Sequence, residues 1–169
     1  PNLIRSPNKD PDKPKDLSIR KSTLVSIRKG MFDVLNDKDG TAYKSRSTNE
    51  NFFIAGKTGT SQVRRITKEE REEGVIKNED LPWKMRDHAL FTCFAPYKNP
   101  KYALSVVVEH GGSGSKVAAP IARDVMLFQL YGGIPSIEAY PEKQRLEVRN
   151  RLLDIAEKIN LKTTMNQLP

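Results

Sequence analysis

Two runs of β-branched and aromatic residues with a short turn between them constrain the fold of this chain more than any other feature. The runs are HALFTCFA (residues 88–95) and KYALSVVVEH (101–110), and the turn APYKNP (95–100) contains two prolines and an asparagine. Apolar runs of this length, bounded by such residues, favour strands, and a short turn between them favours antiparallel pairing. The sequence therefore predicts an antiparallel sheet that contains both segments.

A third strand is expected at residues 51–63, NFFIAGKTGTSQV. It opens with Phe-Phe-Ile and continues through small residues, and glycines inside a strand are typical of places where another group approaches the backbone closely. The next segment, 64–87, is mostly charged. We interpret it as an excursion that leaves the sheet between two strands, and we expect Trp83 to anchor it.

Helices are expected at about residues 18–36, 118–131 and 141–160, which makes the fold class α/β, more specifically α+β. The second helix opens near Pro120, which suits a first helical turn, and closes on two glycines. The third has a weaker pattern. The first is amphipathic, with apolar residues at helical spacing: Ile19, Leu24, Ile27, Met31, Phe32 and Leu35.

The chain is expected to have three parts. Residues 1–16 contain four prolines and many charges, which is typical of a flexible polar start. Residues 17–134 hold the predicted sheet and its helices, with the charged insertion at 64–87, and residues 135–169 form a tail. Because the first residue is Pro1 rather than methionine, we expect a fragment of a longer protein.

Composition narrows the function classes. The net charge is +8, but lysines and arginines are spread along the whole chain, whereas nucleic-acid-binding domains usually gather them on one element. Cys93 is the single cysteine, so the chain holds neither a disulfide pair nor a multi-thiolate metal site. We expect Cys93 to be packed and inert, and we expect His88 and His110 to be structural or solvent-facing rather than metal ligands.

The segment Lys57-Thr58-Gly59-Thr60 has the chemistry of a binding wall beside an acyl-transfer site. The Lys57 charge attracts a carboxylate, and the hydroxyls of Thr58 and Thr60 can donate hydrogen bonds to the same group. Gly59 lets a flat acyl group lie against the strand, and the backbone N–H of Thr60 can face a carbonyl oxygen as an oxyanion donor. Taken alone, this short motif favours an ordinary polar strand, because its three residue types are common and recur in many proteins.

The order of several sequence blocks decides between these readings, because together they resemble class B penicillin-binding proteins, and within them the transpeptidases of cell elongation. The resemblance covers roughly residues 17–131. It implies the C-terminal portion of the β-lactamase/transpeptidase-like fold, and Lys-Thr-Gly is one of three motifs of that superfamily. The blocks are Gly30-Met31 with Val34 and Gly40-Thr41-Ala42, AGKTGTSQV (55–63), RDHALFTCFAPY (86–97), VVVEHGGSG (106–114) and AAPIARDV (118–125).

The resemblance implies a D,D-transpeptidase that cross-links peptidoglycan stem peptides by serine acyl transfer and is acylated by β-lactams. It assigns carboxylate binding to Lys57, Thr58, Gly59 and Thr60, catalytic roles to Lys57 and the Thr60 backbone N–H, and no cofactor or metal. It further implies membrane-protein partners of cell elongation, no nucleic acid, and a place at the periplasmic face of the bacterial inner membrane, with the anchor outside this chain.

The nucleophile of such an enzyme is expected to lie outside this chain. The family places it in a Ser-x-x-Lys motif at the start of a buried helix, far upstream of Lys-Thr-Gly, and no occurrence here has that setting. Ser47-Thr48-Asn49 imitates the second family motif but lies too close to Lys57. We therefore expect the chain to be inactive alone; the alternatives are a non-catalytic peptidoglycan- or partner-binding module and, less favoured, a nucleic-acid-binding domain. The rejected pairs are Ser6/Lys9, Ser18/Lys21, Ser26/Lys29 and Ser113/Lys116.

Overall fold

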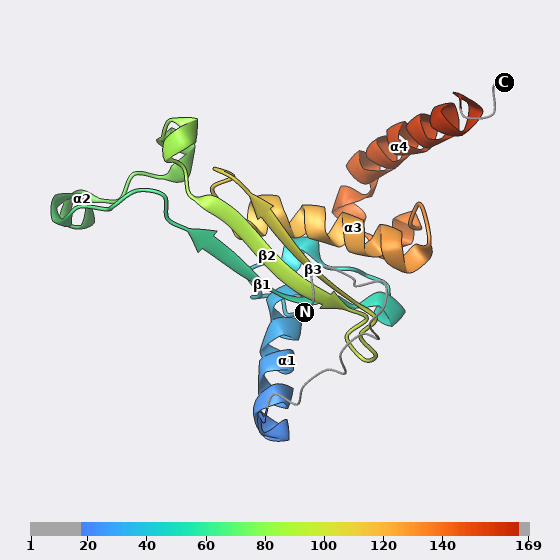
Figure 1. The fold of residues 1–169 in the computed structure, drawn as a ribbon, viewed down its shortest axis with the longest axis horizontal. Coiled ribbons are helices and arrows are strands. Elements are labelled where there is room, and N and C mark those ends of the chain that lie inside the picture. Colours follow the sequence, from blue (N-terminus) through green and yellow to red (C-terminus); the bar gives the residue numbers. More distant parts are fainter. Residues whose placement is uncertain (1–17, 166–169) are drawn as a thin grey trace, which may run out of the picture.

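The fold combines helices with a single three-stranded sheet (Figure 1). This computed structural model describes residues 18–165 of the 169-residue chain, so the expected polar start at 1–16 lies outside the described residues. Several short turns of 3-10 helix and one π-helical turn connect the main elements. In chain order these are α1 (Lys21–Asn36), β1 (Ala55–Ser61), α2 (Lys68–Glu73), β2 (His88–Ala95), β3 (Tyr102–Val108), α3 (Ala119–Tyr131) and α4 (Arg145–Met165).

The predicted sheet is confirmed, with strand order β1-β2-β3 and antiparallel pairing throughout. Lys57 lies opposite Thr92, and Thr92 lies opposite Ser105. Within residues 18–165, the outer edges of β1 and β3 both lack a paired strand. The motif on β1 therefore lies on an open edge of the sheet.

The first strand is shorter than the predicted 51–63. Glu50–Phe52 forms a 3-10 turn instead, because the Asn49 side chain accepts a hydrogen bond from the Asn51 N–H and caps it. Phe52 then packs edge-on against Tyr131 of α3, with ring centroids 5.0 Å apart. The apolar start of the segment thus contacts a helix rather than continuing the strand.

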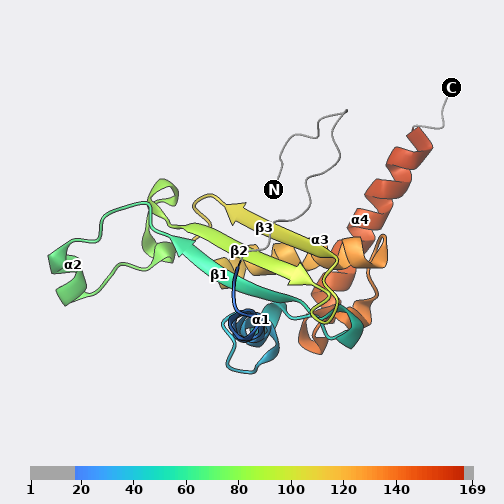
Figure 2. The same cartoon turned by 60° about the horizontal axis from the view of Figure 1, so that its bottom comes forward.

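One face of the sheet forms the core. Along β2 every second side chain is buried, from Ala89 through Phe91 and Cys93 to Ala95. α3 covers this face with Ala119, Ala122 and Met126, which are buried at helical spacing (Figure 2). Cys93 is buried, which confirms the expectation that it is packed. Burial raises the pKa of its thiol to about 12, which disfavours the reactive thiolate.

α1 packs through its C-terminal half. Leu35 is fully buried, and Phe32 lies 5.6 Å from Phe53 and 4.5 Å from Tyr97 between ring centroids. The predicted helix is confirmed, although the apolar side chains of its first turns, such as Val25, are exposed. The buried end fixes the turn that leads from α1 toward β1.

A second, smaller core joins the tail to α3. Leu127 of α3 packs with Ala139, Tyr140 and Val148, all of which are buried. The predicted tail helix is present but begins at Arg145 rather than 141, because Pro141 is followed by a 3-10 turn. α4 then runs outward from the body (Figure 1), and none of the helices in residues 18–165 is both long and apolar enough to cross a membrane.

Candidate active site

The Lys57-Thr58-Gly59-Thr60 segment occupies the middle of the open edge strand β1. Lys57 and Gly59 share one face of the sheet with Thr92 and Leu90, while Thr58 and Thr60 lie on the other face. The lysine side chain is exposed, and its Nζ donates a 2.7 Å hydrogen bond to the carbonyl oxygen of Thr58. Charge and hydroxyls therefore flank the same edge from its two faces.

The bond from Lys57 indicates which backbone groups face outward. In an antiparallel strand one residue directs its N–H and its C=O to the same side, and alternate residues share that side. The Thr58 carbonyl accepts a side chain that reaches it from outside the sheet, so Thr58 and, two residues on, Thr60 direct their backbone groups to the open edge. An extended peptide could pair with both.

A turn residue supports the motif from the side of α1. The hydroxyl oxygens of Thr41 and Thr58 lie 3.4 Å apart. The turn is held by the N–H of Ala42, which donates to the carbonyl of Val34 at 2.9 Å, and Gly40 lies so close to α1 that a Cβ would be 2.3 Å from the Asp33 carbonyl oxygen. Thr41 belongs to one of the family blocks of the sequence, but a contact across 17 residues carries no local signal that would give it a role in the site.

The glycine-rich loop after β3 contacts the motif directly. A Cβ on Gly114 would lie 2.4 Å from the carbonyl oxygens of both Gly59 and Leu90, so the loop rests flush on the backbone of β1 and β2. The Ser113 hydroxyl accepts the N–H of Lys116 and caps the π-helical turn Gly114–Ala118. The loop thereby fixes the position of Gly59.

Replacing Gly114 with alanine is expected to destabilise the protein by about 1–3 kcal/mol, because the added methyl group meets two backbone carbonyls that cannot move aside easily. Gly30→Ala is the matched control: nothing lies within 4 Å of the position that its methyl group would take in α1, so it should stabilise by about 0.5–1 kcal/mol. Urea unfolding measures both free energies. Equal effects of the two substitutions would contradict the close contact.

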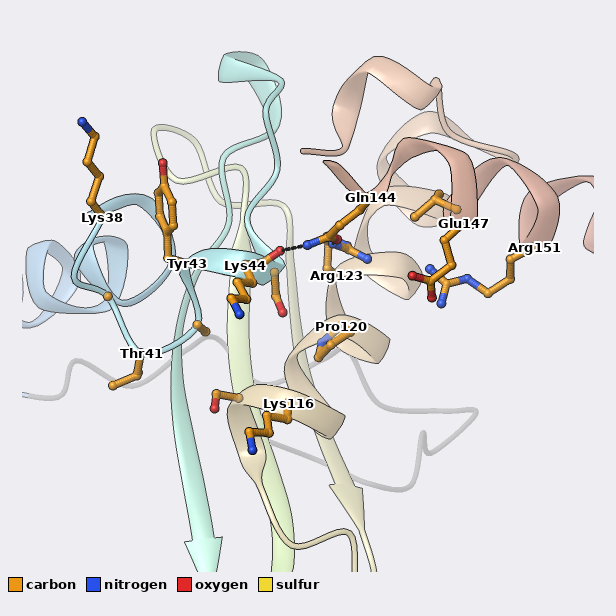
Figure 3. Close-up of a pocket in the computed structure, with 15 residues that line it drawn as sticks. Lys38, Thr41, Tyr43, Lys44, Lys116, Pro120, Arg123, Gln144, Glu147 and Arg151 are labelled. Carbon is orange, nitrogen blue, oxygen red and sulfur yellow. Dashed lines mark hydrogen bonds between the residues drawn. The ribbon is translucent and has the colours of Figure 1, made fainter. Parts of the chain in front are cut away.

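One pocket lies beside the motif, not on it. It has a volume of about 560 Å³ and lies between the turn after α1, the start of α3 and the start of α4 (Figure 3). Thr41 and Lys116 line it, and the side-chain amide of Gln144 closes one end by donating to the Lys44 carbonyl at 2.7 Å. Lys57 is not among the residues that line it.

The rejected Ser-x-x-Lys pairs have ordinary surroundings where the structure describes them. Ser26 and Lys29 are both exposed on α1, where Lys29 pairs with Asp33 at 2.5 Å. Ser113 caps a helical turn through the backbone of Lys116. Lys21 is the exposed first residue of α1, and Ser18 is exposed in the segment before it. Ser6/Lys9 lies outside the described residues.

Ser47-Thr48-Asn49 has a structural role. The Ser47 side chain is buried, the Thr48 N–H donates to the Ala139 carbonyl, and Asn49 donates to the Tyr131 hydroxyl at 2.8 Å. These bonds connect the segment to α3 and to the tail. Its rejection as the second catalytic motif stays a prediction.

The two histidines hold the base of the excursion. His88 Nδ1 accepts the backbone N–H of His110 at 2.9 Å, and His110 Nδ1 donates to the Arg86 carbonyl at 3.0 Å. These contacts confirm the structural interpretation of both residues. Trp83 stacks edge-on against His110 but is 57% exposed, so the prediction that it anchors the excursion is only partly right.

Asparagine and aspartate anchor the excursion more firmly than Trp83. Asn78 Nδ2 donates to an Asp87 carboxylate oxygen at 3.0 Å, and Asn78 Oδ1 accepts the Asp87 N–H at 2.8 Å. This reciprocal pair closes the loop near the start of β2. No sequence pattern singled it out, because the two residues are polar and lie nine positions apart.

A Lys-Thr-Gly segment on an open strand edge, supported by a glycine-rich loop and a helix behind the sheet, matches a known class of protein. Residues 1–127 match the family model described as "Penicillin binding protein transpeptidase domain". The chain belongs to this family.

Individual relatives show which members of the family the chain resembles. Peptidoglycan D,D-transpeptidase MrdA of Haemophilus influenzae is 36% identical over 138 residues, which are 81% of this chain and 20% of the relative. MrdA of Salmonella typhimurium is 40% identical over 100 residues, 59% of this chain and 15% of the relative. Among solved structures, the complex between PBP2 and MreC from Helicobacter pylori matches with a TM-score of 0.55 and 38% identity, covering 75% of this chain and 20% of that chain. The chain thus spans about a fifth of the length of these relatives.

Proposed function

We propose that this chain forms one wall of the active site of a peptidoglycan D,D-transpeptidase, and that the serine nucleophile lies on polypeptide outside these 169 residues. The observation that carries the proposal is the open edge of β1, where the Lys57 charge, two threonine hydroxyls and outward backbone groups converge. The family match and the MrdA relatives support the activity.

The geometry suggests how a peptide binds. Its terminal carboxylate lies between Lys57 and the hydroxyls of Thr58 and Thr60, where charge-assisted hydrogen bonds hold it. Its backbone pairs with the open edge of β1, as a peptide adds to a sheet. This pairing brings the carbonyl of the reacting bond to the N–H of Thr60.

The reaction then proceeds in two acyl transfers. The serine oxygen of the longer protein attacks the carbonyl, its proton passes to a base, and the carbonyl oxygen becomes an anion that the Thr60 N–H stabilises. The C–N bond breaks as the base returns the proton to the leaving nitrogen, and the terminal residue departs as an amine that carries its carboxylate. The amine of a second peptide then attacks the acyl-serine. A new peptide bond forms, the bond to the serine oxygen breaks, and the proton of the attacking amine passes through the base to that oxygen.

The same edge accounts for the ligands and partners that we propose. A β-lactam presents a carboxylate next to a reactive carbonyl, so it can take the place of the peptide at Lys57 and Thr60. The H. pylori PBP2 structure contains MreC, and we propose that the longer protein also works with cell-elongation membrane proteins at the periplasmic face of the inner membrane.

Labelled penicillin tests this function. The full-length polypeptide that carries this sequence should form a stable adduct, whereas the 169-residue chain alone should form none. An adduct on the 169-residue chain would show that its own serines supply the nucleophile. Retention of the chain on insoluble peptidoglycan, with no adduct on the full-length polypeptide, would instead favour a non-catalytic binding module.

Lys57→Ala in the full-length polypeptide should slow acylation by labelled penicillin about 10- to 100-fold, which corresponds to the loss of one charged hydrogen bond. The folded state should be unchanged because the side chain is exposed. Lys98→Ala, an equal charge change in the turn between β2 and β3, is the control and should acylate normally. Equal rates for Lys57→Ala and the unsubstituted protein would remove Lys57 from the mechanism.

A further inference from the structure

We propose that the charged excursion after β1 (residues 64–87, called the arm below) carries a subsite for a carboxylate of the acyl-donor peptide. This subsite lies on the N-terminal side of the bond that reacts. The subsite consists of Arg65, Lys68 and Arg71 around a small pocket. This inference rests on the proposed function, because the direction in which the peptide runs follows from the roles given to Lys57 and Thr60.

The pocket is selectively basic within a segment that is neutral overall. Residues 64–87 contain seven basic and seven acidic side chains. The pocket nevertheless has three cations and no carboxylate on its walls, in a volume of about 300 Å³. The local fold therefore places three basic side chains on the pocket walls and leaves the acidic side chains of the segment off them. The lining residues are Gln62, Arg65, Ile66, Lys68 and Arg71.

The cations of this pocket are available to a ligand. Among residues 18–165, neither the Arg65 nor the Arg71 guanidinium has a hydrogen bond or ion pair to another side chain. Lys68 lies 4.0 Å from Glu72, and both side chains are strongly exposed, so this contact is weak. A guanidinium binds a carboxylate with two parallel N–H bonds, which suits recognition of one acidic group.

A separate ion pair commits the carboxylate of Glu70 to Arg64. Nη1 of Arg64 donates to both carboxylate oxygens of Glu70 at 2.8 Å, with only 17% and 22% of the two side chains exposed. Glu70 also closes a capping box with Thr67, which fixes the start of α2. Hydrogen bonds from Arg64 and from the Thr67 backbone lower the pKa of Glu70, so it stays ionised and committed to them. The arm therefore has a defined fold that presents Arg65 and Arg71.

The proposed binding mode points the donor peptide toward this pocket. With the terminal carboxylate at Lys57 and Thr58 and the reacting carbonyl at Thr60, the peptide runs antiparallel to β1, and its earlier residues pass Ser61. β1 leads directly into the arm that carries α2 (Figure 1). A strand advances about 3.3 Å per residue, so Gln62 lies about 7 Å beyond Thr60. Because Gln62 lines the pocket, its near wall lies within reach of a side chain two or three residues before the reacting bond.

Two labelled peptides test the subsite on the full-length polypeptide. Both end in two D-amino acids, and they differ only in carrying glutamate or glutamine two residues before the reacting bond. Fluorescence anisotropy should show tighter binding of the glutamate peptide by about fivefold, as for a favourable exposed ion pair. Arg65→Gln/Arg71→Gln should abolish this preference, and Arg65→Lys/Arg71→Lys should retain part of it.

A matched variant separates the local effect from net charge. Lys77→Gln/Lys84→Gln removes the same charge from the same arm but leaves the pocket intact, so the preference for glutamate should persist. Equal binding of both peptides to the unsubstituted protein, or loss of the preference in both double variants, would overturn the subsite. Labelled penicillin gives the independent readout: its acylation rate should be unchanged in Arg65→Gln/Arg71→Gln. Absence of any adduct on the unsubstituted protein would refute the proposed function, whereas the peptide comparison alone judges the subsite.

Discussion

Thr60→Pro in the full-length polypeptide will slow acylation by labelled penicillin by about a hundred- to a thousandfold, the usual effect of removing one oxyanion donor. Proline lacks a backbone N–H, and this substitution therefore deletes the group that we place opposite the carbonyl. Because Thr60 faces the open edge of β1, its N–H is not needed for pairing with β2, and an edge position tolerates proline.

Thr60→Ala is the control for this result. It removes the hydroxyl but keeps the N–H, so it should acylate faster than Thr60→Pro, and the ratio of the two rates isolates the backbone donor. Circular dichroism and thermal unfolding would show that both variants are folded. Similar acylation rates for Thr60→Pro and Thr60→Ala would mean that the backbone of Thr60 takes no part in the reaction.

Arg123→Ala will lower the free energy of unfolding by about 3 kcal/mol, because it removes one member of a buried charge network. Arg123 is 2% exposed; its Nε donates to Asp124 at 2.9 Å, and its Nη1 donates to Gln144 at 2.7 Å. Its guanidinium also stacks on Tyr140, with 4.7 Å between Cζ and the ring centroid. Urea unfolding measures the loss, and faster limited proteolysis in the tail would show that Tyr140 and Gln144 have lost their contact with α3.

Arg149→Ala serves as the charge-matched comparison. Arg149 is exposed on α4, so its removal should change the free energy of unfolding by less than about 0.5 kcal/mol. If Arg123→Ala were as mild as Arg149→Ala, the buried network would not be what holds the tail against α3.

The parts of the fold that could be predicted are those with a local pattern. β2 has the predicted limits because its alternation of buried and less buried residues is written in consecutive positions. The start of β1 was misjudged because Phe52 is apolar for a different reason, its contact with Tyr131 almost eighty residues away. Trp83 was predicted to anchor the excursion because a large aromatic side chain suggests burial. It is 57% exposed, and the smaller Leu81 is buried instead.

The same distinction between local patterns and long-range contacts applies to the candidate site. The Lys57 motif could be recognised because its four residues are contiguous and their chemistry is legible together. No local pattern predicts the roles of Thr41, of Gly114, or of the pocket with Arg65 and Arg71. Each role depends on a contact made across a turn or between strands. The hydrogen bond from Arg123 to Gln144 likewise results from packing, and no pattern near Gln144 in the sequence predicts it.

The open edge of β3 has a practical consequence for making this chain by itself. A strand with free backbone groups is a template for another strand, and β3 presents Tyr102 and Val107 as exposed apolar side chains along that edge. Copies of the isolated chain at high concentration can therefore add to one another edge to edge. Refolding at low protein concentration, or the substitution Val107→Lys, should reduce this association. Both leave the strand that carries Lys57 unchanged.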